Sequence, residues 1–146
     1  MVLVDTNVLV HAYNADSPTR DIAADVLQAL ANGSEDWYLS WGIVYEFLRV
    51  STHPRVFRNP ASLAQANGFV RDLLDSPMCH SIAQTPAHGL YLTRSLEETP
   101  RLSGNILHDF HTAVLMREHG IGDIFTFDRD FLTFPWVTMR PIEASI

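Results

Sequence analysis

The stretch Val2-Leu-Val-Asp-Thr-Asn7 places three apolar residues directly before a polar turn. A short, continuous apolar run bounded by turn residues is typical of a buried parallel strand. A similar run, Ile124-Phe-Thr-Phe127, ends at Asp128 near the other end of the chain. Strand-like and helix-like segments alternate between these two runs. The pattern therefore predicts an α/β fold whose mostly parallel central sheet has helices on both faces.

Three further segments have the pattern of strands, and the expected sheet has four to five strands in all. They are residues 37–39, 79–82 and 137–139. The spacing of apolar residues predicts helices at 8–13, 17–33, 43–52, 59–76, 85–96 and 106–119. Ser17-Pro18, Asn59-Pro60 and Thr85-Pro86 indicate helix starts, because proline fits the first helical position. No repeat or linker divides the sequence, so we expect one domain over residues 1–146.

Composition limits the classes of protein that this chain can represent. It has 146 residues, 47% hydrophobic and 18% charged, with a formal net charge of -7. The acidic balance argues against nonspecific coating of nucleic acid, which normally rests on a basic surface. The single cysteine, Cys79, excludes an intramolecular disulfide and a Cys-rich zinc site. With no apolar run of ~20 residues and no signal-peptide pattern, we expect a cytoplasmic protein that does not enter the membrane.

Four carboxylates stand at positions where α/β proteins build sites. Asp5 and Asp128 follow apolar strands, and ligands bind beyond the carboxyl ends of such strands. Glu46 lies beside an apolar helical stripe, and Asp109 lies near the start of a later helix. Each also has a purely structural interpretation. The two strand-end residues are possible helix caps, Glu46 can pair with Arg49, and Asp109 can interact with the helix dipole.

Convergence of these four acids would require a cation among them, because neighbouring carboxylates cannot all ionise without one. Oxygen ligands favour Mg²⁺ or Mn²⁺ over zinc. Such an ion stabilises charge on a phosphodiester and activates water. An acidic protein would then approach an anionic substrate through the metal and not through its own net charge.

Four motifs in sequence order resemble those of PIN domains. They are Asp5-Thr-Asn7, Tyr45-Glu-Phe-Leu-Arg49, Asn105-Ile-Leu-His-Asp109 and Thr126-Phe-Asp-Arg-Asp-Phe131. Their spacing, with the segment 48–54, is similar to that of VapC toxins of bacterial toxin–antitoxin pairs, and the resemblance covers nearly the whole chain. It implies a three-layer α/β/α domain and a Mg²⁺- or Mn²⁺-dependent endoribonuclease. It also implies a homodimer and a VapB-like antitoxin that blocks the active-site groove.

The resemblance assigns roles to particular residues. Asp5, Glu46, Asp109 and Asp128 would be the catalytic and metal-binding acids, and Asn7 and Thr126 would support them through hydrogen bonds. Asp128 is favoured over Asp130 because it is expected to follow the strand directly. Asp130 would aid a second metal or cap the turn. Phe110 stands where the family often has a small residue, and we expect it to narrow the groove.

The remaining signals leave alternatives open. The pair His108-Asp109 invites comparison with HD-domain phosphohydrolases, but the strands before Asp5 and Asp128 argue against that helical architecture. His108 and His111 are rim residues, packing residues or RNA contacts. An RNA path can be drawn along Arg49, Arg55 and Arg58, with Phe57 stacking on bases, although ordinary loop arginines are equally consistent.

Two other functions compete with RNA cleavage. One is a catalytically silent PIN-like module that binds RNA or protein, and the other is a metal-dependent phosphohydrolase of small phosphoesters.

Overall fold

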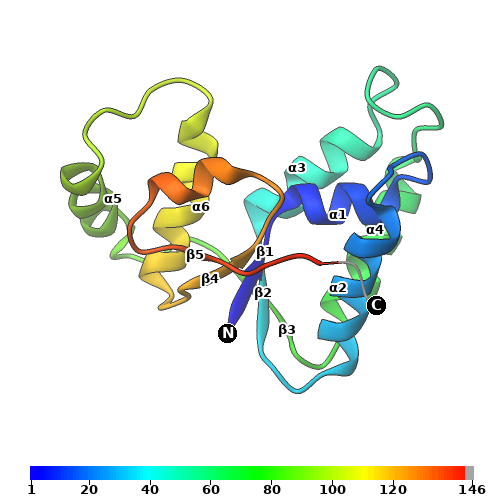
Figure 1. Ribbon diagram of the computed structural model, residues 1–146, viewed down its shortest axis with the longest axis horizontal. Coiled ribbons are helices and arrows are strands. Elements are labelled where there is room, and N and C mark those ends of the chain that lie inside the picture. The colour runs from blue at the N-terminus through cyan, green and yellow to red at the C-terminus, as the bar shows by residue number, and fades with distance from the viewer. Residues whose placement is uncertain (144–146) are drawn as a thin grey trace.

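The computed structural model describes residues 1–143 as three layers, with a five-stranded parallel sheet between two layers of helices (Figure 1). The strand order is β3-β2-β1-β4-β5. The strands are β1 (Val2–Val4), β2 (Trp37–Ser40), β3 (Cys79–Ile82), β4 (Asp123–Phe125) and β5 (Thr138–Met139). The predicted α/β fold with a mostly parallel sheet is confirmed.

Within residues 1–143, six α-helices cover the two faces of the sheet. They are α1 (Thr6–Tyr13), α2 (Arg20–Asn32), α3 (Trp41–Ser51), α4 (Leu63–Leu74), α5 (His88–Glu98) and α6 (Ile106–Glu118). Helices α1 to α4 lie on one face, whereas α5 and α6 lie on the other (Figure 1). A 3₁₀ helix, η1 (Arg129–Thr133), follows β4 and packs against α6. None of the helices within residues 1–143 has the length and apolar character needed to span a bilayer.

The chain order places a crevice between the two central strands. From β1 the chain moves to β2 and β3 on one side, and later returns to β4 and β5 on the other side. The strand order therefore reverses between β1 and β4, which pair in register at Val2–Asp123, Leu3–Ile124 and Val4–Phe125. Ligands of open α/β sheets bind beyond the carboxyl ends of the strands at such a reversal. A site is consequently expected at the segments that follow Val4 and Phe125.

The helix starts differ from those predicted at the Ser-Pro, Asn-Pro and Thr-Pro pairs. Helix α4 begins at Leu63, because Ser62 and Gln65 form a capping box in which each side chain accepts a hydrogen bond from the other's backbone. Helices α2 and α5 begin at Arg20 and His88. In each case the proline lies two or three residues before the helix, in a turn for Pro18 and Pro86 and in irregular chain for Pro60. The predicted helix ends at Gly33 and Gly120 are confirmed, and Gly120 has the positive φ of 70° that glycine adopts most easily.

The core explains why two aromatic residues cannot act as predicted. Phe57 is 3% exposed and packs against Tyr13, so the expectation that it stacks on RNA bases is wrong. Phe110 is 4% exposed and packs against Phe134, so it does not narrow the groove. In both cases the free energy gained by burying a large apolar side chain favours a position in the core.

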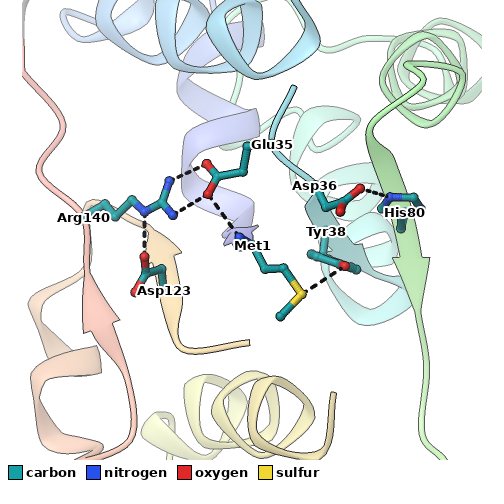
Figure 2. Close-up of polar contacts among 7 residues, drawn as sticks. All are labelled: Met1, Glu35, Asp36, Tyr38, His80, Asp123 and Arg140. Carbon is teal, nitrogen blue, oxygen red and sulfur yellow. Dashed lines mark hydrogen bonds and ion pairs between the residues drawn. The ribbon is translucent and has the colours of Figure 1, made fainter. Parts of the chain in front are cut away.

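Charged contacts hold the amino-terminal ends of the strands together (Figure 2). The Arg140 guanidinium donates two hydrogen bonds of 2.6 Å to Glu35 and one of 2.8 Å to Asp123. The amino group of Met1 donates to the same Glu35 carboxylate at 3.1 Å. These contacts connect Arg140, which follows β5, with residues at the starts of β1, β2 and β4.

Candidate active site and metal centre

The β1 and β4 strand ends are joined at the crevice. The backbone N–H of Asp5 donates to the Phe125 carbonyl at 3.0 Å. This bond continues the β1–β4 pairing by one residue and places the Asp5 side chain beside Thr126. Two segments far apart in the sequence therefore form one surface.

Asp5 is 7% exposed, and three hydrogen bonds hold its carboxylate. Oδ1 accepts from the Thr6 backbone at 2.8 Å, as an N-cap does. Oδ2 accepts from the Thr126 hydroxyl at 2.7 Å and from the Asn7 amide at 3.2 Å. Burial raises the pKa of Asp5, while the Thr126 and Thr6 hydrogen bonds oppose that rise. The helix-cap interpretation and the site interpretation of Asp5 thus both describe this geometry.

Asn7 and Thr126 lie at the centre of this network. The Thr126 hydroxyl accepts from the Asn7 amide and from the Asp128 backbone, both at 3.0 Å. Asn7 Oδ1 accepts from the Phe127 backbone at 3.1 Å. The hydrogen bonds expected of these two residues are present, and they shape the chain between β4 and η1.

Asp109, Asp128 and Asp130 form the tightest group of acids. One carboxylate oxygen from each lies within 4.8 Å of the other two. Burial, followed by the charges of Asp5, Asp128 and Asp130, raises the pKa of Asp109 to about 7. The neighbouring carboxylates therefore disfavour the charged form of Asp109, and a cation would relieve this cost.

Asp128 reaches this group for a different reason from the one predicted. Strand β4 ends at Phe125, so two residues separate the strand from Asp128, and the expectation that Asp128 follows it directly is wrong. Asp128 instead caps η1, since its Oδ1 accepts from the Asp130 backbone at 2.8 Å. The tight turn brings both side chains toward Asp109.

Glu46 lies on α3, on another wall of the cleft. Arg49 donates to it from Nε at 3.0 Å and from Nη2 at 2.6 Å, which lowers the pKa of Glu46. The predicted ion pair is therefore present. Glu46 is not part of the group formed by Asp109, Asp128 and Asp130.

A cleft of about 410 Å³ joins these residues. Its lining includes Asp5, Asn7, Ser40, Glu46, His108, Asp109, His111, Thr112 and Asp128. No lysine or arginine is among its described lining residues, so its charged groups are mainly acidic. Arg49 instead lines a neighbouring pocket of about 730 Å³ with Tyr45 and Leu63. Arg55 and Arg58 are exposed on the connection between α3 and α4.

Some residues around the cleft were not identified from the sequence. Ser40 lines the cleft and caps α3 through its hydroxyl, at 3.1 Å from the Ile43 N–H. A serine at the junction of a strand and a helix is a recognisable cap signal. Gln84 contacts His111 from the loop between β3 and α5, and no local sequence pattern indicates a contact across 27 positions.

The donor chemistry of the site fits a hard divalent cation. Carboxylate oxygens are the available ligands, and the three clustered acids lack a compensating positive charge among the described lining residues. A zinc site would more typically offer thiolates and imidazoles. The acidic group can therefore bind a metal ion.

Comparison with known proteins agrees with the architecture. The family model described as "PIN domain" matches residues 2–136. Ribonuclease VapC48 of Mycobacterium tuberculosis is 31% identical over 137 residues, which is 93% of each chain. Ribonuclease VapC43 of the same organism is 32% identical over 146 residues, covering 99% of this chain and 98% of the relative.

Two solved structures have the same fold. VapBC2 from Rickettsia felis, bound to a DNA fragment from its promoter, aligns with a TM-score of 0.68 and 19% identity, covering 96% of this chain and 98% of that one. VapC20 of Mycobacterium tuberculosis, described as a sarcin-ricin loop cleaving toxin, gives a TM-score of 0.67 and 21% identity, covering 97% and 100%. From the match over residues 2–136 and the similarity to VapC ribonucleases along almost its whole length, the chain belongs to the PIN domain family.

Proposed function

We propose that this protein is a Mg²⁺- or Mn²⁺-dependent endoribonuclease, with residues 1–146 forming one PIN domain. One observation carries the proposal: Asp109, Asp128 and Asp130 converge within 4.8 Å, and Asp109 and Asp128 line a cleft together with Asp5 and Glu46. The relatives named as VapC ribonucleases support the reaction class.

Asp109, Asp128 and Asp130 are the residues that would hold the cation. When bound, such an ion stabilises negative charge on a phosphodiester and lowers the pKa of water. Asp109 must lose its proton to act as a ligand, and its pKa of about 7 makes that loss sensitive to pH near neutrality. Asp5 adds negative charge beside this group. Its two oxygens accept three hydrogen bonds, which leaves roughly one of a carboxylate's four lone pairs for a further ligand.

The other polar residues would orient the substrate and water. Thr126 and Asn7 hold the Asp5 carboxylate in one orientation. Glu46 is the carboxylate on the α3 wall, where it would orient water while Arg49 holds both of its oxygens. Arg55 and Arg58 would contact RNA phosphates outside the cleft, and Arg49 would do so beside its ion pair with Glu46.

The relatives also suggest a biological setting. VapBC2 is bound to a DNA fragment from its promoter, and VapC20 is described as a toxin that cleaves the sarcin-ricin loop. We propose that this chain is the toxin of a type II pair, that it forms a homodimer, and that a VapB-like antitoxin blocks its cleft. A toxin that acts on cellular RNA would work in the cytoplasm.

Cleavage of RNA by purified protein tests this function. Wild type with Mn²⁺ or Mg²⁺ should cut RNA at mapped internal sites, a chelator should stop the reaction, and Asp5→Asn should be inactive while remaining folded. Asp16→Asn is the matched control, because Asp16 is an exposed acid that does not line the cleft. Equal cleavage by Asp5→Asn and wild type would disprove the site assignment.

Two measurements separate the alternative functions. A silent binding module has no reason to bind Mn²⁺ through these carboxylates. If the protein were such a module, calorimetry would detect no Mn²⁺ site that depends on Asp109. A phosphohydrolase of small phosphoesters should turn over a nucleotide monoester faster than structured RNA.

A further inference from the structure

The α6 wall of the cleft carries polar side chains that are not part of the acid group. His108, Asp109, His111 and Thr112 all line the cleft, at the spacing of one helical face. The residues between and after them, Phe110, Ala113 and Val114, are buried against the core. His111 is therefore held at the cleft surface by the same amphipathic pattern that positions Asp109.

Two neighbours fix the His111 ring. Gln84 Nε2 lies 3.1 Å from His111 Nε2. A hydrogen bond between these two nitrogens requires the amide to donate and the ring nitrogen to accept, so the ring proton is on Nδ1. His88 packs against the ring on another side, edge to face, with centroids 5.7 Å apart and planes at 87°.

His88 is itself anchored by a buried carboxylate. The side chain of Glu118 has 0% exposure and accepts from His88 Nδ1 through Oε1. Its other oxygen accepts from the Thr85 backbone at 2.9 Å and from the Thr85 hydroxyl at 2.7 Å. Three donors thus hold Glu118, which holds His88, which packs against His111. An imidazole that is fixed in this way loses little conformational entropy when it binds a ligand.

The Nδ1 atom of His111 is the polar atom of the ring that this arrangement leaves for a ligand. No hydrogen bond to it occurs within residues 1–143. A neutral N–H in an acidic cleft suits an anionic acceptor, because it donates without adding a charge that would compete for the carboxylates. The anion of the proposed substrate is the RNA phosphate.

We propose that His111 is a substrate-contacting residue, which donates a hydrogen bond from Nδ1 to a phosphate oxygen of the RNA, and that Gln84, His88 and Glu118 are positioning residues for its ring. This inference rests on the proposed ribonuclease function and deepens it. It places one substrate phosphate against α6, on the same helical face as Asp109.

Two substitutions separate the donor from the bulk of the ring. His111→Asn keeps an N–H donor near the position of Nδ1, whereas His111→Leu keeps volume without a donor. We expect His111→Asn to stay within about threefold of wild-type kcat/KM and His111→Leu to lose about 10- to 100-fold. His80→Asn is the matched control, since His80 lies on β3 outside the cleft and pairs with Asp36. The proposal is overturned if His111→Leu matches wild type, or if His111→Asn loses as much as His111→Leu.

A modified substrate identifies the acceptor. RNA carrying a methylphosphonate at one linkage lacks the charged oxygen there. When the methylphosphonate replaces the phosphate that His111 contacts, wild-type activity should fall about as far as the His111→Leu substitution lowers it on unmodified RNA. His111→Leu itself should lose no further activity on that modified RNA. The phosphate contact would be refuted if, at every linkage tested, the activity loss caused by the methylphosphonate adds to the loss caused by His111→Leu. Gln84→Leu should lower kcat/KM in the wild-type background and have no effect in the His111→Leu background, as a positioning role requires.

Metal binding distinguishes this inference from the proposed function. Calorimetry with Mn²⁺ should give the same affinity for wild type and His111→Leu, and a weakened affinity would overturn the substrate contact. If wild type does not cut RNA, the proposed function fails. If wild type cuts RNA and Asp5→Asn does not, equal activity of His111→Leu disproves only the role of His111.

Discussion

The Thr126 hydroxyl donates a 2.7 Å hydrogen bond to the Asp5 carboxylate, linking residues 121 positions apart in the sequence. The same hydroxyl accepts hydrogen bonds from Asn7 and from the Asp128 backbone. One buried side chain therefore orients the acid after β1 and shapes the turn that carries Asp128. The geometry of the acid group depends on this contact as well as on the acids themselves.

Thr126→Val should damage both stability and cleavage. It removes one hydrogen-bond partner from Asp5 and one from Asn7 at a buried position, which costs roughly 1–3 kcal/mol of unfolding free energy. Thr126→Ser retains the hydroxyl and should recover most cleavage activity. Urea denaturation with RNA-cleavage assays checks both effects, and equal activity of the Val and Ser variants would contradict the role given to the hydroxyl.

Asp109→Asn should stabilise the metal-free protein at alkaline pH. The folded-state pKa of about 7 lies above the reference value of 3.8, so the folded state binds more protons between these values. Wild-type stability should therefore fall as pH rises from about 4 to about 7. The Asn variant lacks this loss and should be more stable by roughly 1–3 kcal/mol at pH 8 without metal. If the melting temperatures of the two proteins change with pH in the same way from about 4 to 8, the pKa of about 7 for Asp109 is refuted.

Asp128→Ala and Asp130→Ala should both weaken Mn²⁺ binding, by at least about tenfold. They should differ in stability, because Asp128 also caps η1 and removing the cap costs about 1 kcal/mol. Calorimetry and thermal melting separate the two effects. Unchanged Mn²⁺ affinity in Asp130→Ala would remove Asp130 from the metal site.

The double substitution Arg55→Ala with Arg58→Ala should weaken RNA binding without changing the metal site. For a single strand, the slope of log K against log salt falls by about 0.7 for each phosphate that an arginine no longer neutralises, so a total change of about 1.4 is expected. Arg20→Ala on α2 is the control, as an exposed arginine that does not line the cleft. An unchanged salt dependence would show that these arginines are ordinary loop residues.

Glu35→Gln should lower the free energy of unfolding at neutral pH. It should also reduce the further loss of stability when the pH is lowered. Hydrogen bonds from Arg140 lower the pKa of Glu35 to about 2 from 4.5 (Figure 2). The stability from this ion pair is fully present above pH 4.5 and disappears as pH falls through about 2. Urea midpoints measured from pH 2 to 7 should converge for wild type and variant at the acidic end. A constant difference across that range would contradict the assignment.

The sequence predicted strands and helices correctly where the local pattern of apolar residues matches the side chains that the fold buries. The runs at Val2–Val4 and Ile124–Phe127 predicted the two central strands, although β4 ends at Phe125. The prolines gave the wrong helix starts. At α4, the cap hydrogen bonds of Ser62 act more strongly on the boundary than proline's preference for the first helical position. Phe57 and Phe110 were misassigned because one sequence does not show which aromatic rings the core encloses.

Residue type and short-range spacing were enough to predict a parallel α/β protein and to name the acids that could serve its chemistry. The PIN family was indicated by the resemblance of four motifs. Which acids meet depends on contacts between distant elements, which only the folded chain shows. The pairing of β1 with β4 and the tight turn at η1 bring Asp128 and Asp130 to Asp109, while Glu46 stays beside Arg49. The tertiary structure also decided that Gln84, His88 and Glu118 surround His111, because contacts across 27 and 30 positions arise from packing of whole elements and leave no periodic trace in the chain.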